Sequence, residues 1–267
     1  MSLDALADVF RALRSRYLVA ITGAGVSLAS GIPTFRGSDP GAVWANDVME
    51  MGTLRFFRRD PVESWRWYLH RFSKTLDARP NPAHEALARL ERWQEREGRF
   101  LLVTQNIDTL HAQAGSRALV EVHGRADRVR CPAPGCEHGA PRGSLPRADL
   151  DLAPFLADPD EAHLPRCPAC GDVLRQHVLW FDEYYQSHED YQWERVLHAS
   201  EHADLLLLVG TSCSVGVTEL FLRAAQLRRI PVVLVDPGEA PDLPMLQVQA
   251  PAEAFLPALV DALEEQG

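Results

Sequence analysis

Short, almost continuously apolar runs constrain the fold of this chain more than any other feature. Four of them read as buried strands, at residues 17–22, 100–103, 205–209 and 232–235. A strand that is apolar along its whole length needs cover on both faces, which is typical of a parallel sheet between helices. Segments with helical spacing of apolar residues separate the runs. The sequence therefore predicts an α/β fold with a doubly wound parallel sheet.

Local signals indicate where the helices begin. Apolar residues repeat at helical spacing over residues 3–13. Asp60 and Asn81 each precede a proline, which places an N-cap residue before the first position of a helix. The remaining expected elements are helices near residues 108–114, 189–200 and 252–263 and strands at residues 119–122 and 178–181.

Two stretches interrupt this alternation and indicate a second, smaller domain. Residues 37–79 are enriched in Trp, Phe, Met and Arg, and residues 130–172 hold many prolines and four of the five cysteines. We expect both stretches to leave the main sheet. The expected division is a main Rossmann-like domain of residues 1–38, 84–126 and 173–267, with a helical module at 39–83 and a cysteine-rich module at 127–172 forming the small domain.

Composition and charge exclude several classes of function. The chain has 27 basic and 37 acidic residues and a formal net charge of −10, which opposes general attraction to nucleic acids or anionic membranes. No stretch reaches 18 apolar residues, and the first residues show no signal-peptide pattern. We therefore expect a cytoplasmic protein with no membrane and no nucleic-acid partner, and a monomer is favoured.

Four cysteines have the spacing of a metal site. Cys131 and Cys136 form one short knuckle, and Cys167 and Cys170 form another after thirty intervening residues. Two such pairs supply the four thiolates of a tetrahedral zinc site, and four protein ligands leave no open position for a substrate. The sequence therefore predicts one structural Zn²⁺. Incidental or redox-active thiol pairs are the alternative, and Cys213 is expected to be a buried free thiol.

A glycine turn follows the first predicted strand. Gly23-Ala24-Gly25 lies between that strand and an expected helix, where backbone N–H groups and the helix N-terminus can hold a diphosphate. The turn lacks the third glycine of the usual dinucleotide fingerprint, so a purely structural turn remains an alternative. Thr34, Phe35 and Arg36 then offer further contacts on a loop, where ligand contacts concentrate.

Polar residues also follow three other predicted strands. Gln105, Asn106 and Asp108 come after residues 100–103, residues 210–212 (Gly-Thr-Ser) end the most apolar strand, and Asp236 ends the next. Carboxyl ends of parallel strands meet at one edge, where open α/β sheets bind ligands. We therefore expect a single cleft, although Asn106 and Asp108 are equally suited to helix capping.

His123 lies just past the predicted strand at residues 119–122. The chain has ten histidines, so the residue type alone carries little weight. At the edge of the cleft, however, a histidine can act as a general base near neutral pH.

The chain resembles the sirtuin family of NAD-dependent protein deacylases. The resemblance rests on GAGVSLASGIPTFRG at 23–37, TQNIDTLH at 104–111, VHG at 122–124 and GTS at 210–212, and it covers nearly the whole chain. It implies NAD bound at the point where the strand order reverses, a structural zinc module, and His123 and Asn106 as catalytic residues. The implied NAD contacts are Gly23, Ala24, Gly25, Thr34, Phe35, Arg36, Gln105, Asn106, Ile107, Asp108, Gly210, Thr211, Ser212, Asp236 and Ala252.

Tyr68 and Arg71 bear on the acyl group. They lie three residues apart on the helix expected after Asp60, and core packing with a solvated arginine is the simplest interpretation. The pair also resembles, residue for residue, the pair with which some sirtuins hold the carboxylate of succinyl-, malonyl- or glutaryl-lysine. Thr34, where many deacetylases have Asp, resembles that subgroup too.

Two departures from the family pattern concern peptide docking. Asp182 stands where resembling enzymes usually have Gly, and Gln176 where they usually have Pro. Because Asp182 adds a side chain and a charge to a strand expected to pair with the peptide, we expect altered docking.

The resemblance implies an NAD-dependent protein-lysine deacylase that removes acetyl, and also succinyl or malonyl, groups from protein substrates. Its products would be nicotinamide and O-acyl-ADP-ribose. An NAD glycohydrolase or protein ADP-ribosyltransferase with the same cleft is one alternative, and a non-catalytic nucleotide-binding or interaction module is another.

Overall fold

A six-stranded parallel sheet forms the centre of the molecule. The computed structural model describes residues 3–14, 16–34, 49–213, 216–239 and 242–265. The strands lie in the order β3-β2-β1-β7-β8-β9, and every neighbouring pair is parallel. The predicted doubly wound sheet is therefore confirmed. Its strands are β1 (Tyr17–Thr22), β2 (Arg99–Thr104), β3 (Leu119–Glu121), β7 (Leu205–Val209), β8 (Val232–Val235) and β9 (Leu246–Val248).

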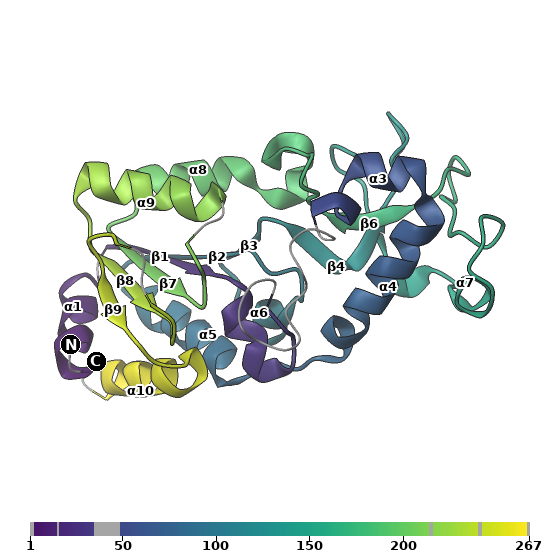
Figure 1. Cartoon of the computed structure of the whole chain (residues 1–267). Coiled ribbons are helices and arrows are strands. Elements are labelled where there is room, and N and C mark those ends of the chain that lie inside the picture. Colours follow the sequence, from purple (N-terminus) through teal and green to yellow (C-terminus); the bar gives the residue numbers. More distant parts are fainter. Residues whose placement is uncertain (1–2, 15, 35–48, 214–215, 240–241, 266–267) are drawn as a thin grey trace.

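Helices cover both faces of this sheet (Figure 1). Neighbouring residues of β1 show why both faces are apolar: Ala20 packs in the core beneath one helical layer, whereas Ile21 packs in the core beneath the other. The first layer holds α1 (Leu3–Ala12), α5 (Pro82–Gln94) and α10 (Ala252–Glu264), and the second holds α8 (Trp193–His202) and α9 (Gly216–Arg228).

A second sheet lies to one side of the first (Figure 1). It is antiparallel, in the order β5-β4-β6, with β4 (Gly124–Arg130), β5 (Leu145–Pro146) and β6 (Arg175–Val178). The helices α3 (Leu54–Arg59), α4 (Pro61–Asp77) and α7 (Ala153–Ala157) belong to the same part of the molecule. Their shared core includes Trp65, whose indole N–H donates to the Leu174 carbonyl at 2.7 Å. We call this part, within residues 49–77 and 124–183, the small lobe.

Capping side chains set the starts of two helices, as the sequence predicts. The Asp60 carboxylate accepts the backbone N–H of Glu63 before α4, and the Asn81 amide oxygen accepts that of Ala83 before α5. The remaining short helices are η1 (Ala24–Ser30), α6 (Leu110–Gln113), η2 (Arg147–Asp149), η3 (Tyr185–Ser187) and η4 (Glu189–Tyr191).

Two predicted elements are wrong in position. The strand expected at 178–181 instead ends at Val178, because the chain turns where the Glu183 N–H bonds to the Trp180 carbonyl at 3.0 Å. The helix expected over 189–200 is interrupted at Gln192, whose φ of 48° is left-handed and separates η4 from α8. None of the described helices is long and apolar enough to cross a membrane.

Candidate functional site

The sequence order of the strands reverses between β1 and β7, and the turns that follow these two strands touch. The Gly25 N–H donates to the Gly210 carbonyl at 2.9 Å, and the Gly23 N–H donates to the Val209 carbonyl at 3.1 Å. A Cβ built on Gly23 or Gly25 would lie 2.8 Å from the backbone of Gly210. Glycine is therefore required at both positions, and the turn continues into the 3-10 helix η1 rather than the expected α-helix.

Side chains after β2 are bonded to this glycine turn. The Asn106 amide donates to the Gly23 carbonyl and to the Ser27 hydroxyl, both at 3.0 Å. The Ser27 hydroxyl donates to Asp108 at 2.6 Å, and the other Asp108 oxygen accepts the N–H of Leu110 at 3.0 Å. Asp108 therefore caps α6 and also faces the glycine turn. Burial raises its pKa, and the Ser27 hydrogen bond opposes that rise.

Gln105 joins the end of β2 to the segment after β7. Its amide N–H group lies 3.1 Å from the hydroxyl of Thr218 and 3.3 Å from that of Thr211. The turns after β1, β2 and β7, residues 23–25, 105–108 and 210–213, thus meet in one place, which we call the carboxyl edge.

The other residues expected at NAD lie around this edge or outside the described chain. The Asp236 carboxylate accepts the Gly238 N–H at 2.8 Å and so closes the turn after β8. Ala252 is buried at the start of α10, and Ile107 packs against the small-lobe core. Thr34 is half-buried, whereas Phe35 and Arg36 lie outside the described residues.

A buried polar network beneath the edge was not predicted from the sequence. The Thr22 hydroxyl donates to that of Thr104 at 2.8 Å and contacts Nε2 of His111 at 2.9 Å. His84, whose ring lies 4.7 Å from that of His111, contacts the Ser27 hydroxyl at 3.5 Å. Burial lowers the pKa of His84 to about 4, so this histidine is neutral at pH 7. The only sequence signal was the pair of threonines that end β1 and β2.

His123 lies beside the carboxyl edge, and each of its ring nitrogens has a polar neighbour. Nδ1 lies 2.9 Å from the Gln105 carbonyl, so it carries the proton and donates it, which leaves a lone pair on Nε2. Burial lowers the pKa of His123 to about 4, and the Gln105 carbonyl opposes that shift. The Tyr185 hydroxyl lies 3.4 Å from Nε2, and the Tyr185 ring stacks on Trp193 with centroids 4.1 Å apart. Tyr185 is a further site residue that we did not predict.

Tyr68 and Arg71 lie on α4 within an aromatic cluster. The Tyr68 ring is buried and stacks on Trp180 with centroids 6.0 Å apart, and burial raises its pKa. The Arg71 guanidinium lies 5.4 Å from the centre of the Trp67 ring, and burial lowers its pKa while Tyr68 opposes the shift. The packing interpretation thus holds for the tyrosine ring, while the arginine remains half-buried beside it.

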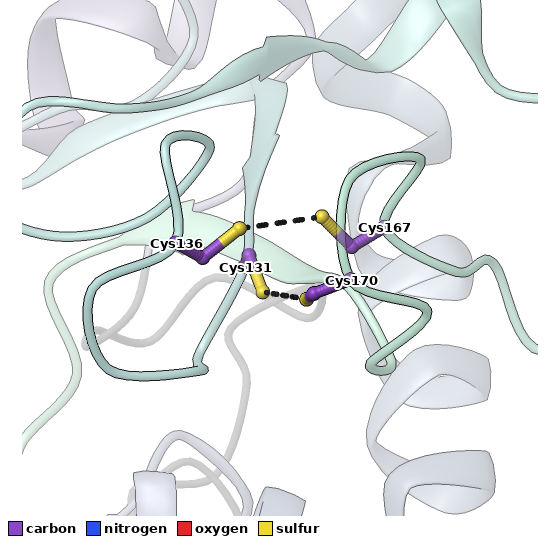
Figure 2. A group of neighbouring side chains, drawn as sticks. All are labelled: Cys131, Cys136, Cys167 and Cys170. Carbon is purple, nitrogen blue, oxygen red and sulfur yellow. Dashed lines mark hydrogen bonds between the residues drawn. The ribbon is translucent and has the colours of Figure 1, made fainter.

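The four knuckle cysteines face a common centre (Figure 2). The Sγ atoms of Cys131 and Cys170 are 3.5 Å apart, as are those of Cys136 and Cys167, and all four lie within 4.8 Å of one another. A tetrahedral zinc ion with Zn–S bonds of about 2.3 Å holds its sulfurs about 3.8 Å apart. The residues therefore fit one structural Zn²⁺. Cys213 is buried away from this group, as predicted.

The match to known proteins agrees with this geometry. The sequence model of the Sir2 family matches residues 23–217. The chain belongs to the Sir2 family. An NAD-dependent protein deacylase of Thermus thermophilus is 42% identical over 233 residues, 86% of this chain and 83% of that protein. The NAD-dependent protein deacylase 1 of Archaeoglobus fulgidus is 36% identical over 86% of this chain and 85% of that protein.

Solved structures of Sir2 homologues share the fold. A Sir2 homologue–NAD complex superposes with a TM-score of 0.78 at 32% identity, covering 98% of this chain and 94% of that one. A Sir2 complex with a p53 peptide and NAD⁺ has a TM-score of 0.75 at 28% identity and covers 100% of this chain and 99% of that one. The Rossmann-like fold expected from the sequence is therefore that of Sir2 proteins.

Of the two departures from the family pattern, only Asp182 has a structural explanation. The Asp182 carboxylate accepts the N–H groups of Leu54 and Arg55 at 2.7 and 3.0 Å, so it caps the N-terminus of α3. Two backbone N–H groups of α3 therefore hold this carboxylate. Gln176 is buried, and neither atom of its amide has a hydrogen-bond partner among the described residues. Nothing in the structure explains Gln176.

Proposed function

We propose that this chain is an NAD-dependent protein-lysine deacylase that transfers the acyl group of an acylated lysine to ADP-ribose. The observation that carries the proposal is the orientation of His123 beside the carboxyl edge. Its Nδ1–H is held by the Gln105 carbonyl, and the lone pair of Nε2 is directed away from that anchor. A neutral, fixed imidazole is what a general base needs, and a binding module has no use for one. The names of the relatives agree with this activity.

The carboxyl edge suits the binding of NAD. The N–H groups of the glycine turn would hold the diphosphate. Thr34 would add a contact, and Phe35 and Arg36, outside the described residues, remain expected contacts. Gln105, Asn106, Ile107 and Asp108 would surround the nicotinamide and its ribose. Gly210, Thr211, Ser212, Asp236 and Ala252 would contact the adenosine half. As the co-substrate, NAD would lose nicotinamide to attack by the acyl oxygen at the anomeric carbon of its ribose. The lysine amine would then leave once a ribose hydroxyl has attacked the acyl carbon.

The chain's own groups then have defined tasks. Asn106 is oriented by its bonds to Gly23 and Ser27, so its carbonyl oxygen can hold a substrate or water on the open side. His123 Nε2 takes a proton from a ribose hydroxyl, which makes that oxygen the nucleophile toward the acyl carbon. The Tyr185 hydroxyl lies 3.4 Å from Nε2, so a ribose hydroxyl that bonds to Nε2 would compete with it.

A preference for negatively charged acyl groups is the finer part of the proposal. The Arg71 guanidinium can form a two-pronged bond to an acyl carboxylate, and the Tyr68 hydroxyl can add a third. Tyr68 also stacks on Trp180, two residues beyond the end of β6, so α4 and the chain after β6 are in contact there. In the small lobe, the four knuckle cysteines would hold a structural Zn²⁺ that does not touch the acyl group.

Two matched peptides test this function. The protein is incubated with NAD and a peptide carrying either acetyl-lysine or succinyl-lysine, and all products are identified by mass spectrometry. Free lysine, nicotinamide and O-acyl-ADP-ribose in equal amounts support the proposal, and faster turnover of the succinyl peptide supports the acyl preference. Consumption of NAD without peptide would indicate a glycohydrolase, and ADP-ribose attached to the peptide would indicate a transferase.

A further inference from the structure

A second cluster of metal-type ligands lies apart from the carboxyl edge and from the cysteine knuckles. His177 on β6, His188 just before η4 and Asp190 within η4 each place one donor atom within 4.8 Å of the others. Nε2 of His177 is 3.0 Å from Oδ2 of Asp190, and Nδ1 of His188 is 3.7 Å from the same oxygen. Donors around a tetrahedral ion with bonds of about 2.0–2.1 Å are about 3.3 Å apart, so these separations fit one shared ion.

The His177 ring is buried, and its Nε2 contact with Asp190 is short but poorly aligned for a hydrogen bond. Its side chain is 0% exposed, and neither ring nitrogen makes a hydrogen bond of acceptable geometry with the described residues. The ring is fixed by packing against Tyr191 and His188, with centroids 5.7 and 4.5 Å away. A buried polar group without a partner costs stability, and coordination through Nε2 would remove part of that cost.

His188 is oriented in the way that metal-binding histidines usually are. Its Nε2 lies 3.1 Å from the Gly143 carbonyl, so Nε2–H donates there and Nδ1 keeps its lone pair. The present partner of Nδ1 is the backbone N–H of Asp190 at 3.2 Å. An ion would replace this one long hydrogen bond.

An open cavity gives access to the cluster. It has a volume of about 430 Å³, and His177 and Asp190 line it. Asp190 is 45% exposed, so hydrated ions can reach its carboxylate and water can fill a fourth position. Among the guanidinium groups that line the cavity, Arg125 pairs with Asp127 at 2.7 Å and Arg142 with Glu189 at 2.6 Å, whereas Arg128 donates to the Ser144 hydroxyl and carbonyl at 2.8 and 2.9 Å.

We propose that His177, His188 and Asp190 bind one divalent transition ion of the zinc class. Two imidazoles and one carboxylate favour zinc, cobalt or nickel over magnesium or calcium. Val178, the next residue on β6, packs in the core that contains Tyr68, so His177 faces the opposite side of the sheet. The ion therefore ties β6 to η4 and lies away from the acyl group.

Cobalt distinguishes this site from the cysteine site. Protein that holds one zinc ion per chain by metal analysis, enough for the cysteine site alone, is titrated with Co²⁺, and absorption is recorded. Binding to nitrogen and oxygen ligands gives weak d–d bands, whereas cobalt at the cysteines adds intense sulfur charge-transfer bands. We expect weak bands that saturate at about one ion per chain, without charge-transfer bands, and a rise in the melting temperature at saturation.

Three variants complete the test. Asp190→Asn changes a half-exposed residue and is expected to fold, and His177→Gln removes a second ligand. Both are expected to weaken cobalt binding by more than about 100-fold, the upper range for losing an outer-shell partner. His163→Gln, in the separate Asp158/Asp160/His163 group, serves as the control and should bind as the wild type does. Absence of saturable weak bands in the wild type, or unchanged binding in Asp190→Asn, would overturn the proposal.

Discussion

The carboxyl edge and the small lobe hold their site residues in different ways. At the carboxyl edge, backbone groups of two turns touch directly, and Asn106, Asp108 and Ser27 bond to one another and to the glycine turn. In the small lobe, β5 has only two residues and the sheet only three strands. Aromatic side chains make up much of its core and pack against the cysteine knuckles. The four thiols of these knuckles face a common centre. The first region is held by its own hydrogen bonds, whereas we expect the second to need an ion at the cysteines as well.

Loss of the zinc ion is expected to have the largest effect and to separate the two regions. Structural zinc supplies about 10–16 kcal/mol in small zinc-binding peptides, comparable to the whole stability of a domain. In Cys167→Ser, we expect hydrogen exchange protection to be lost in β4, β6 and α4 but kept in β1 and β7. The control is Cys213→Ser, which removes a buried thiol outside the knuckles. An equal loss of protection in both sheets would show that the carboxyl edge depends on the cysteine site as much as the small lobe does.

Removal of the general base should slow turnover strongly without changing the fold of either region. We expect His123→Ala to lower kcat by about 10² to 10⁴ on both acyl peptides, because the ribose hydroxyl loses its proton acceptor. Binding of NAD, measured by calorimetry, and the melting temperature should change little. His198→Ala, on the outer face of α8, is the control. A kcat within tenfold of the wild type would refute the role of His123.

The contrast also explains which parts were predictable from sequence. The strands β1, β2, β7 and β8 are apolar along their length, so they are stable only in a sheet that is buried on both faces. The order of these strands along the chain was therefore enough to predict the fold. β6 was misplaced because its first residues, Arg175 and Gln176, are polar yet buried. Arg175 is paired there with Glu183 at 2.6 Å, a partner eight residues away that periodicity does not reveal.

The site residues also fall into a group that the sequence predicts and a group that it does not. Asn106 and Gly23 follow strand ends, where sheet geometry brings them together whatever the rest of the chain does. His84, His111 and Tyr185 reach the site from helices and a connecting segment, and only the tertiary structure places them there. A histidine on an amphipathic helix looks the same in sequence whether it supports a site or only fills a core.

Arg71→Met tests whether the small lobe sets the acyl preference. A hydrogen-bonded charge contributes about 1.5–3 kcal/mol, so the ratio of kcat/KM for succinyl over acetyl peptide should fall about 10- to 100-fold. Arg66→Met, on the exposed side of the same helix, should leave the ratio unchanged. A similar loss on both peptides would show that Arg71 serves packing alone.

Acid should weaken the large sheet through its buried histidines. His84 is neutral when folded, with a pKa of about 4, but takes up a proton below about pH 6.5 when unfolded. The unfolded state therefore binds more protons between these values, and the free energy of unfolding should fall by about 1 kcal/mol per pH unit as pH drops from 6.5 to 4. Denaturant unfolding of the wild type and of His84→Gln at several pH values measures this dependence. If the free energy of unfolding of the variant falls with pH as steeply as that of the wild type, His84 is not its cause.

The smallest expected effect lies where the two regions meet. Tyr185, in η3, follows the small lobe, yet its hydroxyl lies 3.4 Å from Nε2 of His123. Tyr185→Phe keeps the ring stack on Trp193 and removes a hydrogen bond worth about 0.5–1.5 kcal/mol that substrate binding must break. We therefore expect kcat/KM to rise by up to about tenfold and the melting temperature to fall by no more than about 2–4 °C. A fall in kcat would instead mean that the hydroxyl takes part in proton transfer, and the segment that follows the small lobe would then share in the chemistry of His123.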